Sequence, residues 1–407
     1  MPPWSKMGTR DLHNRRAFAG TAYAFAAVML GTTLPTPLYG IYQQEFGFSE
    51  LMITVIFATY AVGVIGALLL FGRLSDQIGR RRALLPGLAF SALSAVVFLL
   101  AQGLVPLLVG RMLSGLSAGI FTGTATAALV DLAGPKERGL ATLVATMVNM
   151  GGLACGPLLA GLLAQFAVAP LRLPFWADLA LLVPAALFIW TLPDTAPAAP
   201  DVRFRPQRLH VPVEARATFV RAALAGFAGF AVLGLFTAVA PGFLGQILGI
   251  QNHAVVGLVV FGVFAASLVG QTALQRIFGG AALPAGCVVL IGGMLLVGLG
   301  LAASSFAALI AGGIIAGLGQ GLSFRAGLAA VNEASPAEHR GEVASSFFVV
   351  AYVAISIPVV GVGLLADVAG LRTAGLVFVA VVVALALAVL ALLNSHAPQS
   401  REALSTE

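Results

Sequence analysis

The feature that most constrains this chain is a succession of apolar segments, most of them about 20 residues or longer, over nearly its whole length. A helix needs roughly 20 apolar residues to cross a hydrocarbon layer about 30 Å thick. In that layer every backbone N–H and C=O must be bonded within the structure, which only helices and closed barrels achieve. The segments are too long and continuous for barrel strands, so they predict membrane-spanning helices.

The low charge content supports this prediction. Only 9% of the 407 residues are charged, whereas a soluble domain carries about a quarter. Breaks at polar, proline and glycine residues predict helices over 17–42, 49–71, 83–102, 105–131, 138–164, 173–192, 217–247, 254–275, 282–303, 306–331, 341–366 and 371–393. We therefore expect an all-α membrane protein of twelve transmembrane helices. Six-helix bundles at 1–192 and 217–407 flank a proline-rich cytoplasmic linker at 193–216.

Positive charges gather in alternate loops and explain the net charge of +6. Loops that would share one side carry Arg16, Arg80, Arg81, Arg82, Lys136, Arg138, Arg208, Arg276 and Arg340, whereas the opposite loops carry Arg172 and Arg372. An excess of Lys and Arg marks the cytoplasmic side of a membrane. We expect both termini in the cytoplasm of a bacterial cell, the protein in its inner membrane, and anionic lipid rather than nucleic acid beside these charges.

The two halves of the chain resemble each other at an offset near 202 residues. The fourth expected helix carries Gly115 and Gly119, and the tenth carries Gly317 and Gly321. The loops that follow, at 134–139 and 335–341, share a Pro-x-Glu pattern that ends in glycine. Parallel repeats of this kind place a binding site between two halves that rock to expose it on alternate sides.

The stretch GRLSDQIGRRR, from Gly72 to Arg82, resembles the cytoplasmic loop signature of the major facilitator superfamily, and the resemblance extends over essentially the whole chain. It implies two pseudo-symmetric six-helix bundles. It also implies a latch in which Asp76 braces helix 341–366 and Arg80 pairs with Asp131. The implied latch residues are Gly72, Asp76, Gly79, Arg80, Arg81, Asp131 and Arg138. The alternative is that these charges only set the topology.

Two further segments resemble drug:proton antiporters of that superfamily. Arg111 precedes a stripe of small residues, and an arginine inside a span is costly unless it faces the bundle interior or water. It is expected to neighbour a proton site or an anionic substrate, or else to snorkel to the membrane surface. The second segment, with Gly152, Gly156, Pro157 and Gly161, is expected to kink and pack closely. It would seal the periplasmic end or serve only as a packing stripe.

The resemblance assigns the first, fourth, seventh and tenth helices, with parts of others, to the wall of a substrate cavity. The candidate lining residues are mostly aromatic, hydroxyl and amide side chains: Tyr23, Thr33, Thr36, Tyr39, Tyr60, Asn149, Phe227, Phe230, Phe236, Gln246, Gln320, Phe324 and Tyr352. Such a lining suits amphipathic organic molecules, although lipid contact or core packing is the alternative for any one aromatic. The candidates for proton coupling are Arg111, Asp131 and Asp178, and Asp178 could instead favour the start of its helix.

The resemblance thus implies a monomeric secondary transporter that exports small amphipathic, drug-like compounds by proton antiport through alternating access. A sugar or metabolite exporter and a proton symporter of the same fold are the alternatives. A membrane-embedded enzyme is a distant third, because the sequence shows no histidine pair at ligand spacing, no phosphate-binding loop and no Ser/His/Asp set at membrane depth. We expect no metal and no cofactor. The expected partners are substrate, protons and membrane lipid.

Overall fold

The structure is a computed structural model that describes residues 9–72, 74–193 and 206–395, with side chains from residue 14 onward. Helices dominate these ranges, and no strand occurs in them, which confirms the expected all-α fold. The long helices are α1 (Thr9–Thr33), α3 (Glu50–Phe71), α5 (Arg80–Leu99), α6 (Leu104–Ala133), α7 (Arg138–Phe166), α8 (Leu173–Trp190), α9 (Val213–Ala238), α11 (His253–Val269), α13 (Ala282–Ala302), α14 (Phe306–Glu333), α15 (Arg340–Ala369) and α16 (Leu371–Asn394).

Short helical pieces join or extend them: η2 (Thr36–Leu38), α2 (Tyr39–Phe46), α4 (Leu74–Ile78), α10 (Ala240–Gly242), η3 (Phe243–Ile247), η4 (Gly270–Leu274), α12 (Gln275–Phe278), η5 (Gly279–Ala281) and η6 (Ala337–His339). The residues outside the described ranges include Arg73 in the loop after α3, Lys6 and Arg401 in the tails, and Arg203 and Arg205 in the linker.

Within the described residues, 11 helical runs are long and apolar enough to cross a membrane. One of them, His253–Ala302, is 50 residues long and contains the eighth and ninth expected helices. These helices meet at Gly279, where a φ of 50° ends α12 before η5 and α13 begin. Glycine tolerates such a positive φ without the steric cost that other residues pay. The arrangement is consistent with twelve crossings.

The single helices expected at 17–42 and 217–247 are each broken, which corrects those two predictions. Helix α1 ends at Thr33, and η2 lies between it and α2 in a segment that contains Pro35 and Pro37. In the seventh span, α9 likewise ends at Ala238, and the chain continues as α10, which contains Pro241, and then as the π-helix η3. Proline lacks the backbone N–H that a continuing helix needs, so each break follows from the local sequence.

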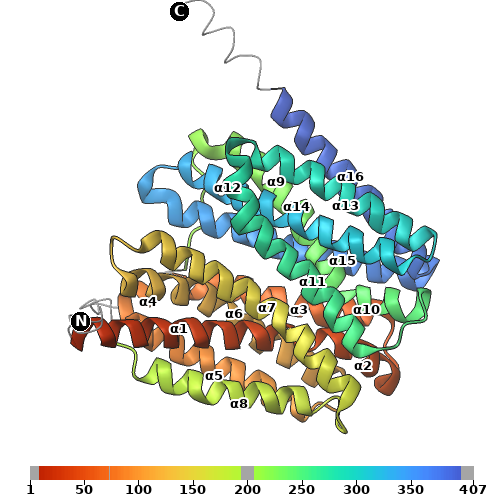
Figure 1. Cartoon of the computed structure of the whole chain (residues 1–407), viewed down its shortest axis with the longest axis horizontal. Coiled ribbons are helices and arrows are strands. Elements are labelled where there is room, and N and C mark those ends of the chain that lie inside the picture. Colours follow the sequence, from red (N-terminus) through yellow and green to blue (C-terminus); the bar gives the residue numbers. More distant parts are fainter. Residues whose placement is uncertain (1–8, 73, 194–205, 396–407) are drawn as a thin grey trace, which may run out of the picture. The chain divides into compact units, whose positions relative to one another are not determined.

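Contacts between backbone positions group the chain into two compact units. One comprises Met1–Leu38 and Thr59–Gln207, and the other comprises Tyr39–Ala58 and Arg208–Glu407. The segment Tyr39–Ala58 therefore belongs with the second half of the chain although it lies in the first half of the sequence. In the first unit α8 lies beside α1 and α5, and in the second unit α13 lies beside α14 and α16 (Figure 1).

The repeated glycines serve the same purpose in each unit. In the first unit a Cβ added at Gly115 would overlap the carbonyl oxygen of Tyr60 on α3, and Gly119 packs against Val64 of the same helix. In the second unit a Cβ at Gly321 would overlap the carbonyl oxygen of Ser267 on α11. Glycine lets two helix backbones approach in this way, so the repeat in the sequence corresponds to a repeated helix contact.

Candidate functional site

The broken end of α1 is held by a buried arginine. The Arg111 side chain on α6 is 2% exposed, and its Nη1 donates a 2.6 Å hydrogen bond to the backbone oxygen of Thr32. Its guanidinium carbon lies 4.6 Å from the centre of the Tyr60 ring. The last carbonyls of a helix lack partners along the helix and carry partial negative charge. Arg111 therefore caps the end of α1 and does not snorkel to the surface.

An acidic side chain packs against Gly31, the residue that precedes Thr32 at the same helix end. Asp178 on α8 is 3% exposed, and its Oδ1 has no hydrogen-bond partner. A Cβ added at Gly31 would lie 2.8 Å from both of its carboxyl oxygens, so only glycine permits this approach. An isolated carboxylate is strongly destabilised in an apolar interior, which favours the neutral, protonated form. The end of α1 thus has a buried cation and a buried acid beside consecutive residues.

The segment of α7 that resembles antiporters packs against the same helix. A Cβ at Gly152 would lie 2.6 Å from the backbone oxygen of Ala26, and one at Gly156 would overlap the oxygen of Leu30. Pro157 and Gly161 are buried within α7. The Thr33 hydroxyl donates a 2.8 Å hydrogen bond across to the backbone oxygen of Leu153. The segment therefore packs closely on α1, as its composition predicted, whereas its proposed role as a seal stays a prediction.

The charged loop after α3 forms a compact cluster. Arg80, whose side chain is 12% exposed, donates from Nε to Asp131 Oδ2 at 3.0 Å and from Nη1 to Asp76 Oδ1 at 2.5 Å. The same Nη1 also donates to the Ser75 hydroxyl at 2.9 Å. Gly79, with a φ of 97°, turns the chain between α4 and α5 and so presents the arginine to α6. The structure thus contains the Arg80–Asp131 pair that the resemblance implied.

Other residues of the implied latch lie near this cluster or at its edge. The Arg81 guanidinium lies 5.5 Å from the centre of the Trp190 ring at the end of α8. Gly72 follows α3, and the exposed Arg138 begins α7. The expected contact between Asp76 and helix 341–366 stays a prediction.

Several of the cavity candidates in the first unit have structural partners. The Tyr23 hydroxyl donates to the backbone oxygen of Leu181 at 3.0 Å. Thr33 and Thr36 are buried at the break after α1, and Tyr60 lies beneath Arg111. Asn149 is half-buried on α7.

In the second unit, Phe230 and Phe324 meet with ring centres 5.0 Å apart, and Phe347 extends the group. Gln320 is fully buried and accepts a 2.5 Å hydrogen bond from Ser267, while its own Nε2 has no partner. The remaining candidates lie on the same helices: Phe227 and Phe236 on α9 and Tyr352 on α15.

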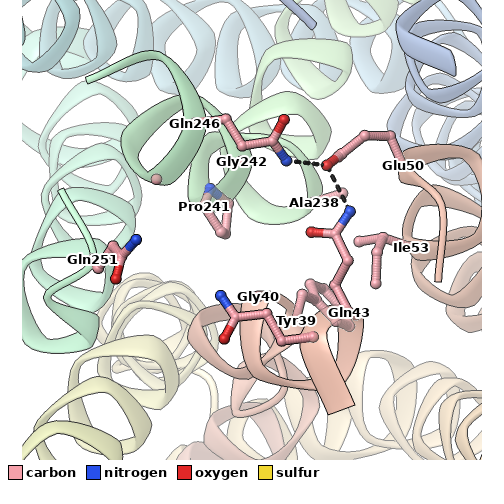
Figure 2. A pocket seen from close by; sticks show the side chains of 12 residues that line it. Tyr39, Gly40, Gln43, Glu50, Ile53, Ala238, Pro241, Gly242, Gln246 and Gln251 are labelled. Carbon is pink, nitrogen blue, oxygen red and sulfur yellow. Dashed lines mark hydrogen bonds between the residues drawn. The ribbon is translucent and has the colours of Figure 1, made fainter. Parts of the chain in front are cut away.

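Tyr39 and Gln246 line a pocket of about 270 Å³ that lies within the second unit. Figure 2 shows amide side chains around one carboxylate, that of Glu50, at the start of α3. Glu50 Oε1 accepts hydrogen bonds from Gln43 Nε2 at 2.7 Å and from Gln246 Nε2 at 2.5 Å. Gln43 belongs to α2, whereas Gln246 belongs to η3.

Glu50, Gln43 and Ser75 belong to these clusters but were not predicted from the sequence. Glu50 and Gln43 stand in the short polar stretch between two spans, where an acid and an amide are unremarkable. The available signal was the acid at the first position of a helix, a position that the helix dipole favours. That signal does not reveal that Gln246, 196 residues away, donates a hydrogen bond to the same carboxylate oxygen of Glu50 as Gln43 does.

Eleven long apolar helical runs and a repeated helix contact define a multi-pass membrane protein. The chain belongs to the Major Facilitator Superfamily, whose sequence profile matches residues 21–292. It is 31% identical over 168 residues to a multidrug resistance protein MdtL of Escherichia coli and 30% identical over 167 residues to that of Escherichia fergusonii. Each match covers 40% of this chain and 41% of the relative, so the chain aligns with about two-fifths of those curated relatives.

Solved structures show the same fold over almost the whole chain. A bacterial homologue of the human lysosomal transporter Spinster, inward-facing and unoccupied, has a TM-score of 0.70 and 14% sequence identity. That match covers 93% of this chain and 97% of the homologue. The human organic anion transporter MFSD10 has a TM-score of 0.65 and 18% identity, covering 97% of this chain and 100% of MFSD10. The family is one of transporters, which points away from an enzyme.

Proposed function

We propose that the protein exports small amphipathic organic compounds in exchange for protons, by alternating access. The observation that carries the proposal is the broken end of α1, where the buried Arg111 and the buried Asp178 contact consecutive residues. Ionisable groups inside a membrane span are expensive and are retained for transport of ions, protons or substrates. The relatives named as multidrug resistance proteins support drug-like compounds as the substrate class.

Asp178 is the proposed proton carrier at this site. Its carboxyl group has an oxygen without a partner and lies against α1, so a change in its charge acts directly on that helix. When it is neutral, the apolar surroundings tolerate it, and when it is ionised, it needs water or a cation. Loss of its proton would therefore favour a conformation in which this part of α8 is hydrated. Such a coupling is what proton antiport requires.

The cluster around Arg80 is the proposed cytoplasmic latch. The three hydrogen bonds of its guanidinium join α4 to α6 within the first unit. Asp131 is the second candidate for a proton carrier, because its protonation would remove one of the two charges that hold Arg80. We place this loop and both termini on the cytoplasmic side of a bacterial inner membrane, in keeping with the positive charges of the alternate loops.

Purified protein in liposomes tests the exchange. With a pH-sensitive dye inside, addition of ethidium should release protons across the membrane only when the protein is present. Asp178→Asn should abolish this proton movement and leave ethidium binding intact, because the amide keeps the shape but cannot titrate. Proton movement in the same direction as the substrate would favour a symporter instead. Undiminished antiport in Asp178→Asn together with its loss in Asp131→Asn would assign the proton to the latch.

Growth inhibition in an efflux-deficient host tests the substrate class. Expression of the protein should raise resistance to several amphipathic dyes and antibiotics. Resistance that stays unchanged for every compound class would favour the alternative of a sugar or metabolite exporter.

A further inference from the structure

The pocket that contains Glu50 has a distinctive chemical lining. Twelve residues line it, and Glu50 is the only charged one among them. Four glutamines contribute amide groups: Gln43, Gln44, Gln246 and Gln251. Apolar surface comes from Ile53, Ala238 and Pro241. The pocket thus combines a single negative charge with many hydrogen-bonding groups and a small apolar wall.

The charge of Glu50 is stabilised but not neutralised. Its Oε1 accepts two amide N–H groups, and these donors are themselves neutral. Its Oε2 points toward Gly242, where an added Cβ would lie 3.4 Å away. No basic side chain is among the lining residues. A half-buried carboxylate in this setting gains from a cation that enters the pocket, because ionised groups withdrawn from water favour an opposite charge.

The glutamines indicate which cation suits the pocket. Gln43 and Gln246 give their amide N–H groups to Glu50, so their carbonyl oxygens remain as acceptors. Figure 2 shows these amides and Gln251 around the same space. Acceptors beside a carboxylate suit an ammonium group, which carries several N–H donors. The pocket volume of about 270 Å³ suits a small molecule.

Two glycines keep the pocket open. A Cβ added at Gly40 or at Gly245 would have nothing within 4 Å, and neither residue has a positive φ that would strain a side chain. Both line the pocket, so a larger side chain at either position would enter empty space rather than displace the backbone.

We propose that this pocket binds small organic ammonium ions, with Glu50 as the counter-ion and the glutamine carbonyls as hydrogen-bond acceptors. The inference extends the proposed function by naming a ligand class, and it rests on that function only for the consequence that such cations are transported. If Glu50 served only to link α2, α3 and η3 through its hydrogen bonds, the pocket would show no preference for a cation over a neutral ligand.

Binding to the purified full-length protein tests the proposal. Isothermal titration should show phenethylamine, which is a cation at neutral pH, binding about fivefold more tightly than the uncharged 2-phenylethanol. Glu50→Gln should remove this preference and bring the two affinities together. Glu45→Gln is the matched control, because Glu45 is an exposed acid of α2 outside the pocket lining.

Blocking the pocket gives an independent test. Gly40→Leu and Gly245→Leu should lower the affinity for both compounds at least tenfold while the melting temperature is maintained, because each side chain fills open space. Gly361→Leu is the control, since this exposed glycine of α15 also has nothing within 4 Å and lies outside the pocket. Equal affinities for the two compounds in the wild type would overturn the proposal. So would a cation preference that survives Glu50→Gln.

The two proposals fail separately. Proton exchange on addition of ethidium is measured on the same preparation in liposomes. A cation preference that depends on Glu50 without any proton exchange would remove the proposed function and leave the binding site standing. Proton exchange without a cation preference would remove the proposed binding site and leave the proposed function standing.

Discussion

Replacement of Arg111 by lysine should be more damaging to stability than replacement by methionine. The Arg111 guanidinium donates a hydrogen bond to the backbone oxygen of Thr32 and lies over the Tyr60 ring. The Arg111 side chain is only 2% exposed. Lysine keeps the buried charge, but its single ammonium group cannot occupy both positions. Methionine removes the charge and approximates the volume.

The magnitudes follow from the contacts. A hydrogen bond to a charged group contributes about 1.5–3 kcal/mol, and a desolvated cation over an aromatic ring contributes about 2 kcal/mol. Arg111→Lys loses at least one of these, about 2 kcal/mol, and the cost of burying a cation remains. Arg111→Met loses both, but it also removes a burial cost of several kcal/mol, so its net loss is smaller.

Equilibrium unfolding in mixed micelles with increasing SDS measures both variants. The free energy of unfolding should fall by about 2 kcal/mol in Arg111→Lys and by less in Arg111→Met. Arg172→Lys, at an exposed position before α8, should match the wild type. A lysine variant as stable as the wild type would refute the reasoning, because any positive charge at this position would then suffice to cap α1.

Other predictions address the latch, the repeat and the topology. Asp131→Asn should change the free energy of unfolding by less than about 1 kcal/mol, because the pair is partly exposed, while it slows transport in vesicles. Gly115→Val should lower the free energy of unfolding by about 1–3 kcal/mol in the same SDS titration, because the side chain forces α6 and α3 apart. Gly123 has open space around it, so Gly123→Val should lower the free energy of unfolding by less than half as much. In a variant without native cysteines, a membrane-impermeant maleimide should label Val168→Cys in intact cells and Lys136→Cys only after permeabilisation; the opposite pattern would invert the proposed topology.

The positions of the spans could be predicted because they depend on local properties. The expected helix 105–131 is observed as Leu104–Ala133, and the expected helix 371–393 as Leu371–Asn394. Apolar length and the breaks between segments are read directly from the chain. The breaks at Pro35 and Pro241 were also visible as prolines, but a proline within an apolar run does not reveal whether a helix kinks or ends.

The candidate sites were only partly predictable. The Arg80–Asp131 pair could be predicted because its loop resembles a known signature, and the structure contains the pair. Arg111 stood out as a charge inside a span, but its partner is the backbone oxygen of Thr32, which no side-chain pattern marks. The grouping of Tyr39–Ala58 with the second half of the chain had no signal in the sequence at all.

The sequence by itself determined that the chain forms apolar helices in two related sets, because the cost of placing a polar residue in lipid is set residue by residue. Only the tertiary structure decided which buried groups meet. Arg111 donates a hydrogen bond to Thr32, 79 positions away, and Glu50 accepts one from the amide of Gln246, 196 positions away. Such contacts depend on how helix faces pack and where helices break, and both result from the whole set of side chains acting together.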